Sequence, residues 1–238
     1  MSKRFIVEQS NLTVEGDIAV IKGQEVHHIN VLRYKVGDSV YINEHEINIT
    51  KITNDLLMGK IVGKLPQKGI PNVNITLIQS YLKSDKMDYV VQKAVELGVN
   101  NIIPVITKNT VVKMEEKDKI KKVERLIKIA KEAVEQCGRT DMVDVQSVQD
   151  INSLDFSKFD SVLVCHETST VDLKQTINSL RNVNNIAVII GPEGGLDNTE
   201  VCKVLKNNNT VDVSLGERIL RAETASLAIL SVLGYELG

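Results

Sequence analysis

The hydrophobic pattern changes its period near residue 70, and this change divides the chain into two parts. Before residue 70, short runs of alternating apolar and polar residues are separated by turn residues such as Gly16-Asp17 and Gly37-Asp38. The strand-like runs are Ile18–Val20, Ser39–Ile42, Ile47–Ile52 and Met58–Val62, with one helical segment from Gln24 to Tyr34 between them. Short strands at this spacing predict a small β domain of the barrel type.

From residue 72 onward, strand-like apolar runs alternate with stretches of helical period. The expected strands are Asn74–Ser80, Asn101–Ile106, Met142–Val148, Ser161–Cys165, Ile186–Ile190 and Thr210–Leu215, and the expected helices lie near 85–97, 117–137, 172–181, 198–207 and 222–236. This alternation predicts an α/β domain, in which helices cover both faces of a parallel sheet. The segment from Lys64 to Pro71 holds two prolines and a glycine. It is the expected linker between domains at 1–70 and 72–238.

Composition and charge narrow the classes of protein. The formal net charge is −2, so the whole chain has no general attraction for nucleic acid or membrane, and any RNA contact must depend on local groups. Cys137, Cys165 and Cys202 are too widely spaced for a zinc or disulfide framework, which indicates free thiols in a reducing compartment. No signal peptide or apolar stretch of membrane-spanning length is present, so we expect a cytoplasmic protein.

A metal site is not expected. His27 and His28 are adjacent within the helical segment of the first domain. Neighbouring residues on a helix point in different directions, so these two imidazoles are poorly placed to bind one ion. A surface or capping role is the better interpretation of both side chains.

Two glycine-bearing segments near the C-terminal end organise the second domain. The apolar run Ile186–Ile190 stops at Gly191-Pro192-Glu193-Gly194-Gly195, and Val211–Leu215 stops at Gly216 before an apolar helix. A short apolar run closed by glycine is typical of a buried parallel strand that ends in a turn. Because ligands bind at the carboxyl ends of such strands, we expect the two loops to meet in one pocket.

The first loop does not suit a phosphate group. Its glycines let a ligand lie against the backbone, but no lysine follows them as a phosphate-binding loop requires. Glu193 also places a negative charge in the loop, which favours a cationic ligand with sugar hydroxyls, such as S-adenosylmethionine. Beyond the glycines, Asp197 and Glu200 have the spacing of a capping box that begins a helix.

The second loop carries the candidates for chemistry. Ile219 and Leu220 are apolar where a loop is usually polar, and they suit the walls of an adenine slot. Arg221 either forms a salt bridge with Glu217 or Glu223, or directs its charge at RNA phosphate or at a reacting base. His166 follows a buried strand, so it either reaches the pocket or serves as a capping or core histidine.

Basic and polar side chains elsewhere are candidates for RNA contacts. These candidates are Arg4, Arg33, Lys83, Lys86, Gln136 and Arg139. The alternative for each is an ordinary solvated charge or a place on a helix surface. The same alternative applies to the lysine-rich segment from Lys113 to Lys122.

Several motifs together resemble the ribosomal RNA (uracil-N3) methyltransferases, the RsmE family of the SPOUT superfamily. The strongest are Ile190–Gly195, Glu200, and Leu215-Gly216-Glu217-Arg218-Ile219-Leu220-Arg221-Ala222-Glu223-Thr224-Ala225. Similar motifs follow at Lys86–Asp88, Gln92–Val99, Glu132-Ala133, Gln136–Arg139, His27-His28, Val31–Arg33 and Gly37-Asp38. They run through the whole chain in order, and their combination is far more specific than any single one.

The resemblance implies a fold, a cofactor and an activity. It implies a PUA-like domain that binds RNA, followed by an α/β domain with a trefoil knot at about 186–230, in a homodimer. S-adenosylmethionine would be held by Ile190, Gly191, Glu193, Gly194, Gly195, Leu215, Gly216, Ile219 and Leu220. The methyl group would pass to N3 of one uridine in 16S rRNA of the small ribosomal subunit.

Uridine N3 is a weak acid that must lose its proton before it attacks a methyl group. A cation can stabilise the resulting anion, and Arg221 is the candidate for that role. Glu193, His166 and solvent all remain open as the group that takes the proton. Two other classes compete with this interpretation: a nucleotide hydrolase or transferase that binds phosphate in the glycine loop, and a non-catalytic RNA-binding assembly factor.

Overall fold

The computed structural model describes residues 4–65 and 72–238. The chain divides into two compact units, one of residues 1–70 with 134–141 and one of residues 71–133 with 142–238. The hydrophobic pattern did not predict that residues 134–141 would join the first unit. The predicted linker from Lys64 to Pro71 lies outside the described residues apart from Lys64 and Leu65.

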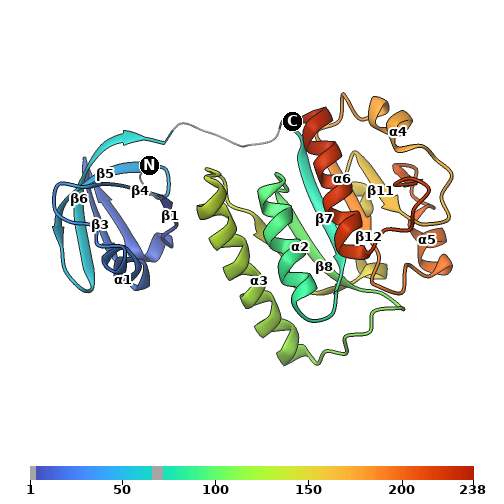
Figure 1. The fold of residues 1–238 in the computed structure, drawn as a ribbon, viewed down its shortest axis with the longest axis horizontal. Coiled ribbons are helices and arrows are strands. Elements are labelled where there is room, and N and C mark those ends of the chain that lie inside the picture. Colours follow the sequence, from blue (N-terminus) through green and yellow to red (C-terminus); the bar gives the residue numbers. More distant parts are fainter. Residues whose placement is uncertain (1–3, 66–71) are drawn as a thin grey trace. The chain divides into compact units, whose positions relative to one another are not determined.

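The first unit is a β structure with one helix (Figure 1). Its elements are β1 (Arg4–Phe5), a 3₁₀ turn (Gln9–Asn11), β2 (Leu12–Glu15), β3 (Ile18–Lys22), α1 (Gln24–Val31), β4 (Ser39–Ile42), β5 (His45–Ile52) and β6 (Leu56–Lys64). The six strands form one sheet in the order β1-β4-β5-β6-β3-β2. β1 pairs with β4 in parallel, and the other pairs are antiparallel. Within the described range, no pairing joins the end strands β1 and β2 to each other.

Alternating apolar positions build the core of this unit. Ile47 and Ile49 of β5 are buried, as are Val26 and Ile29 of α1. Phe5 packs edge-on against His28 with ring centroids 5.5 Å apart. His28 therefore has a packing role in the structure. β1 was not predicted because a strand of two residues is too short to show a period.

The second unit alternates strands and helices. Its elements are β7 (Asn74–Ser80), α2 (Asp85–Glu96), β8 (Asn101–Ile106), α3 (Glu116–Cys137, whose end belongs to the first unit), β9 (Asp144–Val145), β10 (Gln149–Asp150), 3₁₀ turns at Ile151–Ser153 and Phe156–Lys158, β11 (Ser161–Cys165), α4 (Leu173–Ser179), β12 (Asn185–Ile190), α5 (Asn198–Val204), β13 (Thr210–Val213) and α6 (Ala222–Leu237). The predicted strand Met142–Val148 is wrong as a single element. That stretch pairs with β8 only through β9, and β10 pairs with β8 further along the chain.

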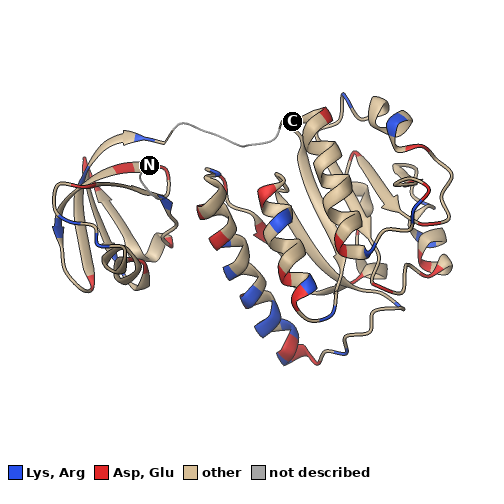
Figure 2. Ribbon diagram, in the orientation of Figure 1, with Lys and Arg blue, Asp and Glu red and all other residues tan. Residues whose placement is uncertain are grey.

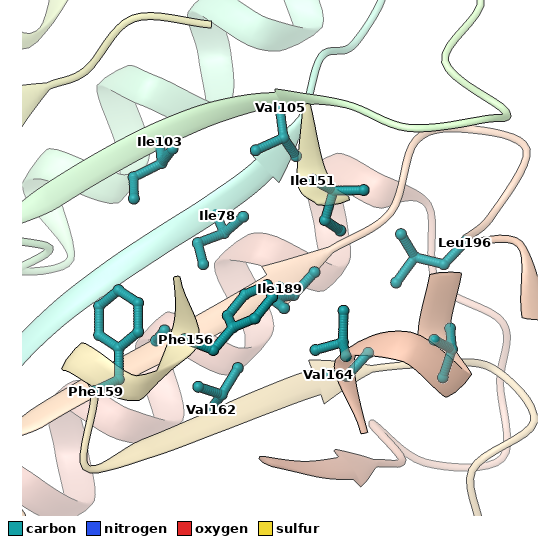
Figure 3. Close-up of a cluster of buried hydrophobic side chains, with 13 residues drawn as sticks. Ile78, Ile103, Val105, Ile151, Phe156, Phe159, Val162, Val164, Ile189 and Leu196 are labelled. Atoms are coloured by element: carbon teal, nitrogen blue, oxygen red, sulfur yellow. The ribbon is translucent and has the colours of Figure 1, made fainter. Parts of the chain in front are cut away.

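The sheet of the second unit is parallel, as the alternation predicts. Its order is β10-β8-β7-β12-β11-β13, with β9 also paired to β8, and every recorded pairing is parallel. One face forms a hydrophobic cluster with α5 and the two 3₁₀ turns, in which Ile78, Val164 and Ile189 meet Phe156 and Phe159 (Figure 3). On α6, the fully buried Ser226 donates a hydrogen bond to the equally buried Gln79 of β7.

The strand order decides where a site can form. β12 lies between β7 and β11, and β11 pairs with β13 on its other side. Because these strands are parallel, their carboxyl ends lie at one edge of the sheet. The segments that follow β11, β12 and β13 are therefore neighbours, although they are far apart in the sequence.

α5 begins with the capping box that the sequence predicts. The Asp197 side chain accepts a hydrogen bond from the Thr199 backbone, and the Glu200 carboxylate accepts one from the Asp197 backbone. Lys108 Nζ lies 2.7 Å from Asp197 Oδ2. The hydrogen bonds from Lys108 and Thr199 lower the pKa of Asp197 to about 2. This start of α5 holds the end of the first glycine loop in place.

Replacing Asp197 with alanine is expected to lower the melting temperature by about 3 °C, because α5 loses its cap. The folded-state pKa is depressed, so this contribution is present above pH about 4 and is lost as the pH falls toward about 2. Thermal unfolding across that range measures both effects. Asp197→Asn is the control, because asparagine keeps the cap but removes the charge. Equal melting temperatures for wild type and Asp197→Ala at neutral pH would contradict the assignment.

Candidate functional site

A pocket of about 330 Å³ lies at the carboxyl ends of β11, β12 and β13. Three loops and one residue of α2 line it: Lys86; Cys165, His166 and Glu167; Ile190, Gly191, Pro192, Glu193, Gly195 and Leu196; and Ser214 to Ala222 with Ala225. The two glycine-bearing loops therefore meet in one pocket, as the sequence predicts. Of the nine expected cofactor-binding residues, Gly194 alone is not among the lining residues.

The glycines of the first loop are placed where there is little or no room for a side chain. A Cβ on Gly191 would lie 2.9 Å from the backbone nitrogen of Leu196. Gly195 has φ +71°, and a Cβ there would lie 3.4 Å from the Glu167 carboxylate. Asn109 donates hydrogen bonds to the carbonyl oxygens of Gly194 and Gly195, at 3.3 and 3.1 Å. Gly194 therefore faces Asn109, Gly191 allows the loop to close tightly against Leu196, and Gly195 faces Glu167 in the pocket wall.

Glu193 is exposed and has a structural partner as well as a place in the pocket wall. Its Oε1 accepts a hydrogen bond from the backbone N–H of Lys83, 3.1 Å away. The contact ties the turn after β7 to the loop after β12. Glu193, Glu167 and Glu217 line the same space. The carboxylates favour a ligand that carries positive charge.

The candidate catalytic residues Arg221 and His166 also line the pocket. Arg221 is exposed at the N-cap position of α6, and no ion pair among the described residues joins it to Glu217 or Glu223. His166 is half-buried, and its Nδ1 lies 2.8 Å from Thr168 Oγ1. This contact leaves Nε2 as the ring nitrogen available to the pocket. Both side chains therefore line the pocket, and their catalytic roles stay predictions.

Glu223 forms its ion pair with Lys86 and not with Arg221. Lys86 Nζ lies 3.2 Å from Glu223 Oε1, and both side chains are partly buried. Burial raises the pKa of Glu223, but hydrogen bonds from its own backbone and from Lys86, with the charges of Lys86 and Arg221, lower it overall. Lys86 is thus part of the pocket wall. The sequence suggested an RNA contact for this lysine and did not predict its place in the pocket.

The other candidates for RNA contact fall into two groups. Lys83, Arg33 and Gln136 are exposed. Arg4 is only 7% exposed, and its guanidinium donates to the carbonyl oxygens of Asn43 and Thr140. Arg139 is only 3% exposed and forms a salt bridge with Asp141. Burial of these two arginines disfavours a direct contact with RNA phosphate, because most of each side chain is enclosed by the protein.

The lysine-rich segment before and along α3 behaves as a solvated face. Basic and acidic residues are interspersed along this helix (Figure 2). Lys117 pairs with Glu115, and Lys119 pairs with Glu116. Much of the positive charge is thus neutralised locally.

Sequence reasoning missed Glu167. It follows His166 directly at the end of β11 and lines the pocket beside Gly195. The rule that placed His166 at a strand end would also have included its neighbour. The position of Lys86 offered no such signal, because it depends on how α2 packs beside α6.

Within the described ranges, no cluster of three or more His, Cys, Asp or Glu side chains has the arrangement of a metal site. No helix in that part of the chain has the length and apolar character needed to cross a membrane. Cys137, Cys165 and Cys202 are free thiols. Burial raises the pKa of the Cys165 thiol to about 12, so this pocket residue stays protonated at neutral pH.

Comparison with known proteins places the chain in a family. Residues 70–234, which contain the whole pocket, match the family model of an RNA methyltransferase domain. Ribosomal RNA small subunit methyltransferase E of Bacillus subtilis is 31% identical over 98% of this chain and 96% of that protein. The chain belongs to the ribosomal RNA small subunit methyltransferase E family. The family that the motifs predict is therefore confirmed.

Solved methyltransferase structures share the fold. Ribosomal RNA small subunit methyltransferase E from Neisseria gonorrhoeae, solved with S-adenosylmethionine bound, is 26% identical with a TM-score of 0.83. The likeness covers 98% of this chain and 97% of that one. A methyltransferase of Legionella pneumophila, also solved with the cofactor, has the same identity and TM-score and covers 99% and 98% of the two chains.

Proposed function

We propose that this member of the family methylates N3 of one uridine in 16S rRNA, with S-adenosylmethionine as the methyl donor. Methylation of small-subunit ribosomal RNA with this donor is the activity of the family to which the chain belongs. The proposal adds the atom that is methylated and the residues that act. The main support is that two glycine-bearing loops meet in one pocket, which Glu167, Glu193 and Glu217 also line.

The residues of the pocket fit the cofactor. Gly191 and Gly195 leave the backbone accessible, and a side chain at either position would meet Leu196 or Glu167. Ile219 and Leu220 offer apolar walls for the adenine ring, and Glu193 complements the positive charge. When bound, S-adenosylmethionine supplies an electrophilic methyl group on a positively charged sulfur. The remaining chemistry belongs to the protein and the RNA.

The protein must expose the Watson–Crick edge of the uridine and hold N3 in line with the methyl group. No ion pair among the described residues joins Arg221 to Glu217 or Glu223, so its charge can act on the uracil anion. Of the three possible proton acceptors, His166 fits best. Its Nδ1 is held by Thr168, whereas Glu193 already accepts the Lys83 amide. Solvent is the remaining alternative, and unchanged turnover in a His166→Ala variant would favour it.

The finer features of the fold are part of the proposal. We assign the first unit as a PUA-like barrel that binds RNA through Arg33. The expected limits at 1–70 and 72–238 describe the two domains along the chain, except that residues 134–141 pack with the first unit. The segment 186–230 is assigned as a trefoil knot. The six-stranded sheet and the neighbouring ends of β11, β12 and β13 support these assignments. Lys83 and Gln136 complete the proposed RNA contacts.

We also propose a homodimer. α6 is apolar around most of its circumference, and Tyr235 near its end is 87% exposed. Such a helix is usually buried, either in the core or against another chain. The cytoplasmic localisation expected from the sequence stays part of the proposal, because ribosomal RNA is the substrate.

The decisive experiment incubates the protein with small ribosomal subunits from a strain that lacks this modification, using S-adenosylmethionine labelled in its methyl group. We expect label in 16S rRNA and recovery of 3-methyluridine after digestion to nucleosides. Subunits from a wild-type strain are the control and should accept no label. Label in another nucleoside would reject the N3 assignment. Tight RNA binding without label would support an assembly factor, and binding of ATP in place of S-adenosylmethionine would support a nucleotide-using enzyme.

A further inference from the structure

Two carboxylates attach the turn after β7 and the start of α2 to neighbouring elements of the pocket. Lys83 donates its backbone N–H to Glu193, and Lys86 forms its ion pair with Glu223 in the first turn of α6. Between these contacts, Ser84 has φ 51° and ψ −140°, a conformation that non-glycine residues rarely adopt. Such a backbone persists where the surrounding contacts hold it, and it is common at functional sites. These contacts hold Lys86 in the pocket wall.

Among the described residues, the ion pair between Lys86 and Glu223 lacks the full set of hydrogen bonds that would make a buried pair stabilising. Glu223 Oε2 is buried and accepts no hydrogen bond from any side chain or backbone group in the described ranges. An unsatisfied buried carboxylate oxygen costs free energy, and a buried ion pair is weak evidence for stabilisation. About a third of the Lys86 side chain (34%) stays accessible, and that side chain lines the pocket. Glu223 therefore fixes where the Lys86 ammonium lies.

We infer that Lys86 is a second catalytic cation and that Glu223 is its positioning residue. This inference rests on the proposed methylation of uridine N3. When the N3–H bond breaks, the proton passes to the base and the negative charge spreads over N3, O2 and O4 of the ring. The electron pair on N3 then forms the bond to the methyl carbon, and the electrons of the methyl–sulfur bond stay on sulfur. Lys86 and Arg221, from different elements, stabilise the charge on the ring.

The charges around Lys86 favour this role over a phosphate contact. Glu193 lies on the loop after β12, His166 and Glu167 follow β11, and Glu217, Arg218 and Arg221 follow β13. Lys86 is thus held inside a pocket that contains three carboxylates as well as Arg218 and Arg221. Carboxylates oppose any anion, but they oppose the localised charge of a phosphate more than the delocalised charge of a uracil ring that lies near Lys86 and Arg221.

Replacing Lys86 with methionine is expected to change the pH dependence of turnover. Without the cation, the N3 proton of the bound uridine is harder to remove, so the midpoint of the rate should move up by about one pH unit. At pH 7 this corresponds to about a tenfold lower kcat, because a shift of one pKa unit changes the fraction of uridine present as the anion about tenfold. At high pH the rate should approach that of the wild type. Single-turnover methylation of small subunits from pH 6 to pH 10 measures this profile.

Matched variants separate catalysis from structure. Lys93 and Glu96 form an ion pair on the same helix, outside the pocket. Lys93→Met is therefore expected to keep the wild-type profile, and Lys86→Arg should keep it because the charge remains. Glu223→Gln is expected to lower kcat in the wild-type background. In the Lys86→Met background it should change kcat by less than about twofold, because the two residues act as one unit.

Three outcomes would overturn the inference. A Lys86→Met loss that is constant across pH would indicate a phosphate contact or a structural role. An unchanged rate would remove Lys86 from the reaction, and additive effects of Lys86→Met and Glu223→Gln would remove Glu223 as its positioning residue. The wild-type product is identified in the same assay. A product other than 3-methyluridine rejects the proposed function itself, whereas 3-methyluridine with an unshifted profile rejects the role of Lys86 alone.

Discussion

Gly195→Val is expected to weaken S-adenosylmethionine binding by at least about 100-fold, the scale of overpacking a well-filled site. Gly195 has φ +71°, where a β-branched side chain is strained. Its Cβ would lie 3.4 Å from the Glu167 carboxylate, so the two methyl groups of valine must displace Glu167 or enter the pocket. Isothermal titration calorimetry with the cofactor measures the loss.

A second glycine separates backbone strain from pocket filling. Gly138 has φ +77°, and a Cβ there would meet nothing within 4 Å. Gly138→Val carries similar strain outside the pocket, so its Kd for the cofactor should stay within about twofold of the wild type. Gly195→Ala is a milder probe, should the valine variant fail to fold, and we expect about a tenfold weaker Kd. Unchanged affinity in folded Gly195 variants would contradict the pocket.

Arg221→Ala is expected to lower turnover by about 100-fold or more while the affinity for S-adenosylmethionine stays within a few-fold. This is the scale of losing one preorganised charge that acts mainly in the transition state. The structure supports the split, because Arg221 lines the pocket but is exposed and is not tied to Glu217 or Glu223. Single-turnover rates and calorimetry on the same preparation separate the two quantities.

The control for Arg221 is Arg181→Ala, which removes an exposed arginine of the same unit outside this pocket. Its turnover should match the wild type. Arg221→Lys keeps the charge but loses the planar fork, so an intermediate rate is expected. Normal turnover in Arg221→Ala would exclude this side chain from the mechanism. A parallel loss of cofactor affinity would make it a binding residue.

Much of the second unit was predictable because its signals are local. Asn74–Ser80 and Asn101–Ile106 are strands with the predicted limits, and the capping box at Asp197 lies where the residues placed it. Parallel pairing followed from the alternation of elements. The prediction of one strand at Met142–Val148 was wrong, because an apolar run does not reveal whether a partner strand lies beside it. Only β8 is available there, and it pairs through β9 and later β10.

The roles of charged residues, in contrast to the strands and the capping box, could not be predicted from local signals. Arg4, Arg139 and Lys86 were predicted as candidates for RNA contacts from their charge and their place along the chain. In the structure, Arg4 and Arg139 are buried among carbonyl and carboxylate partners, and Lys86 lies in the pocket beside Glu223. The sequence cannot distinguish these cases, since a cation's role depends on which acceptors the fold brings within a few ångströms.

The sequence by itself determined the family, the alternation of strands and helices, and the loops that carry glycine. Each of these depends on residues that are close together in the chain, or on a set of motifs in a fixed order. The tertiary structure decided that the ends of β11, β12 and β13 share one edge, which brings Glu167 against Gly195 and Lys86 against Glu223. Contacts between distant segments follow from strand order and helix packing, and no local pattern of residues encodes them.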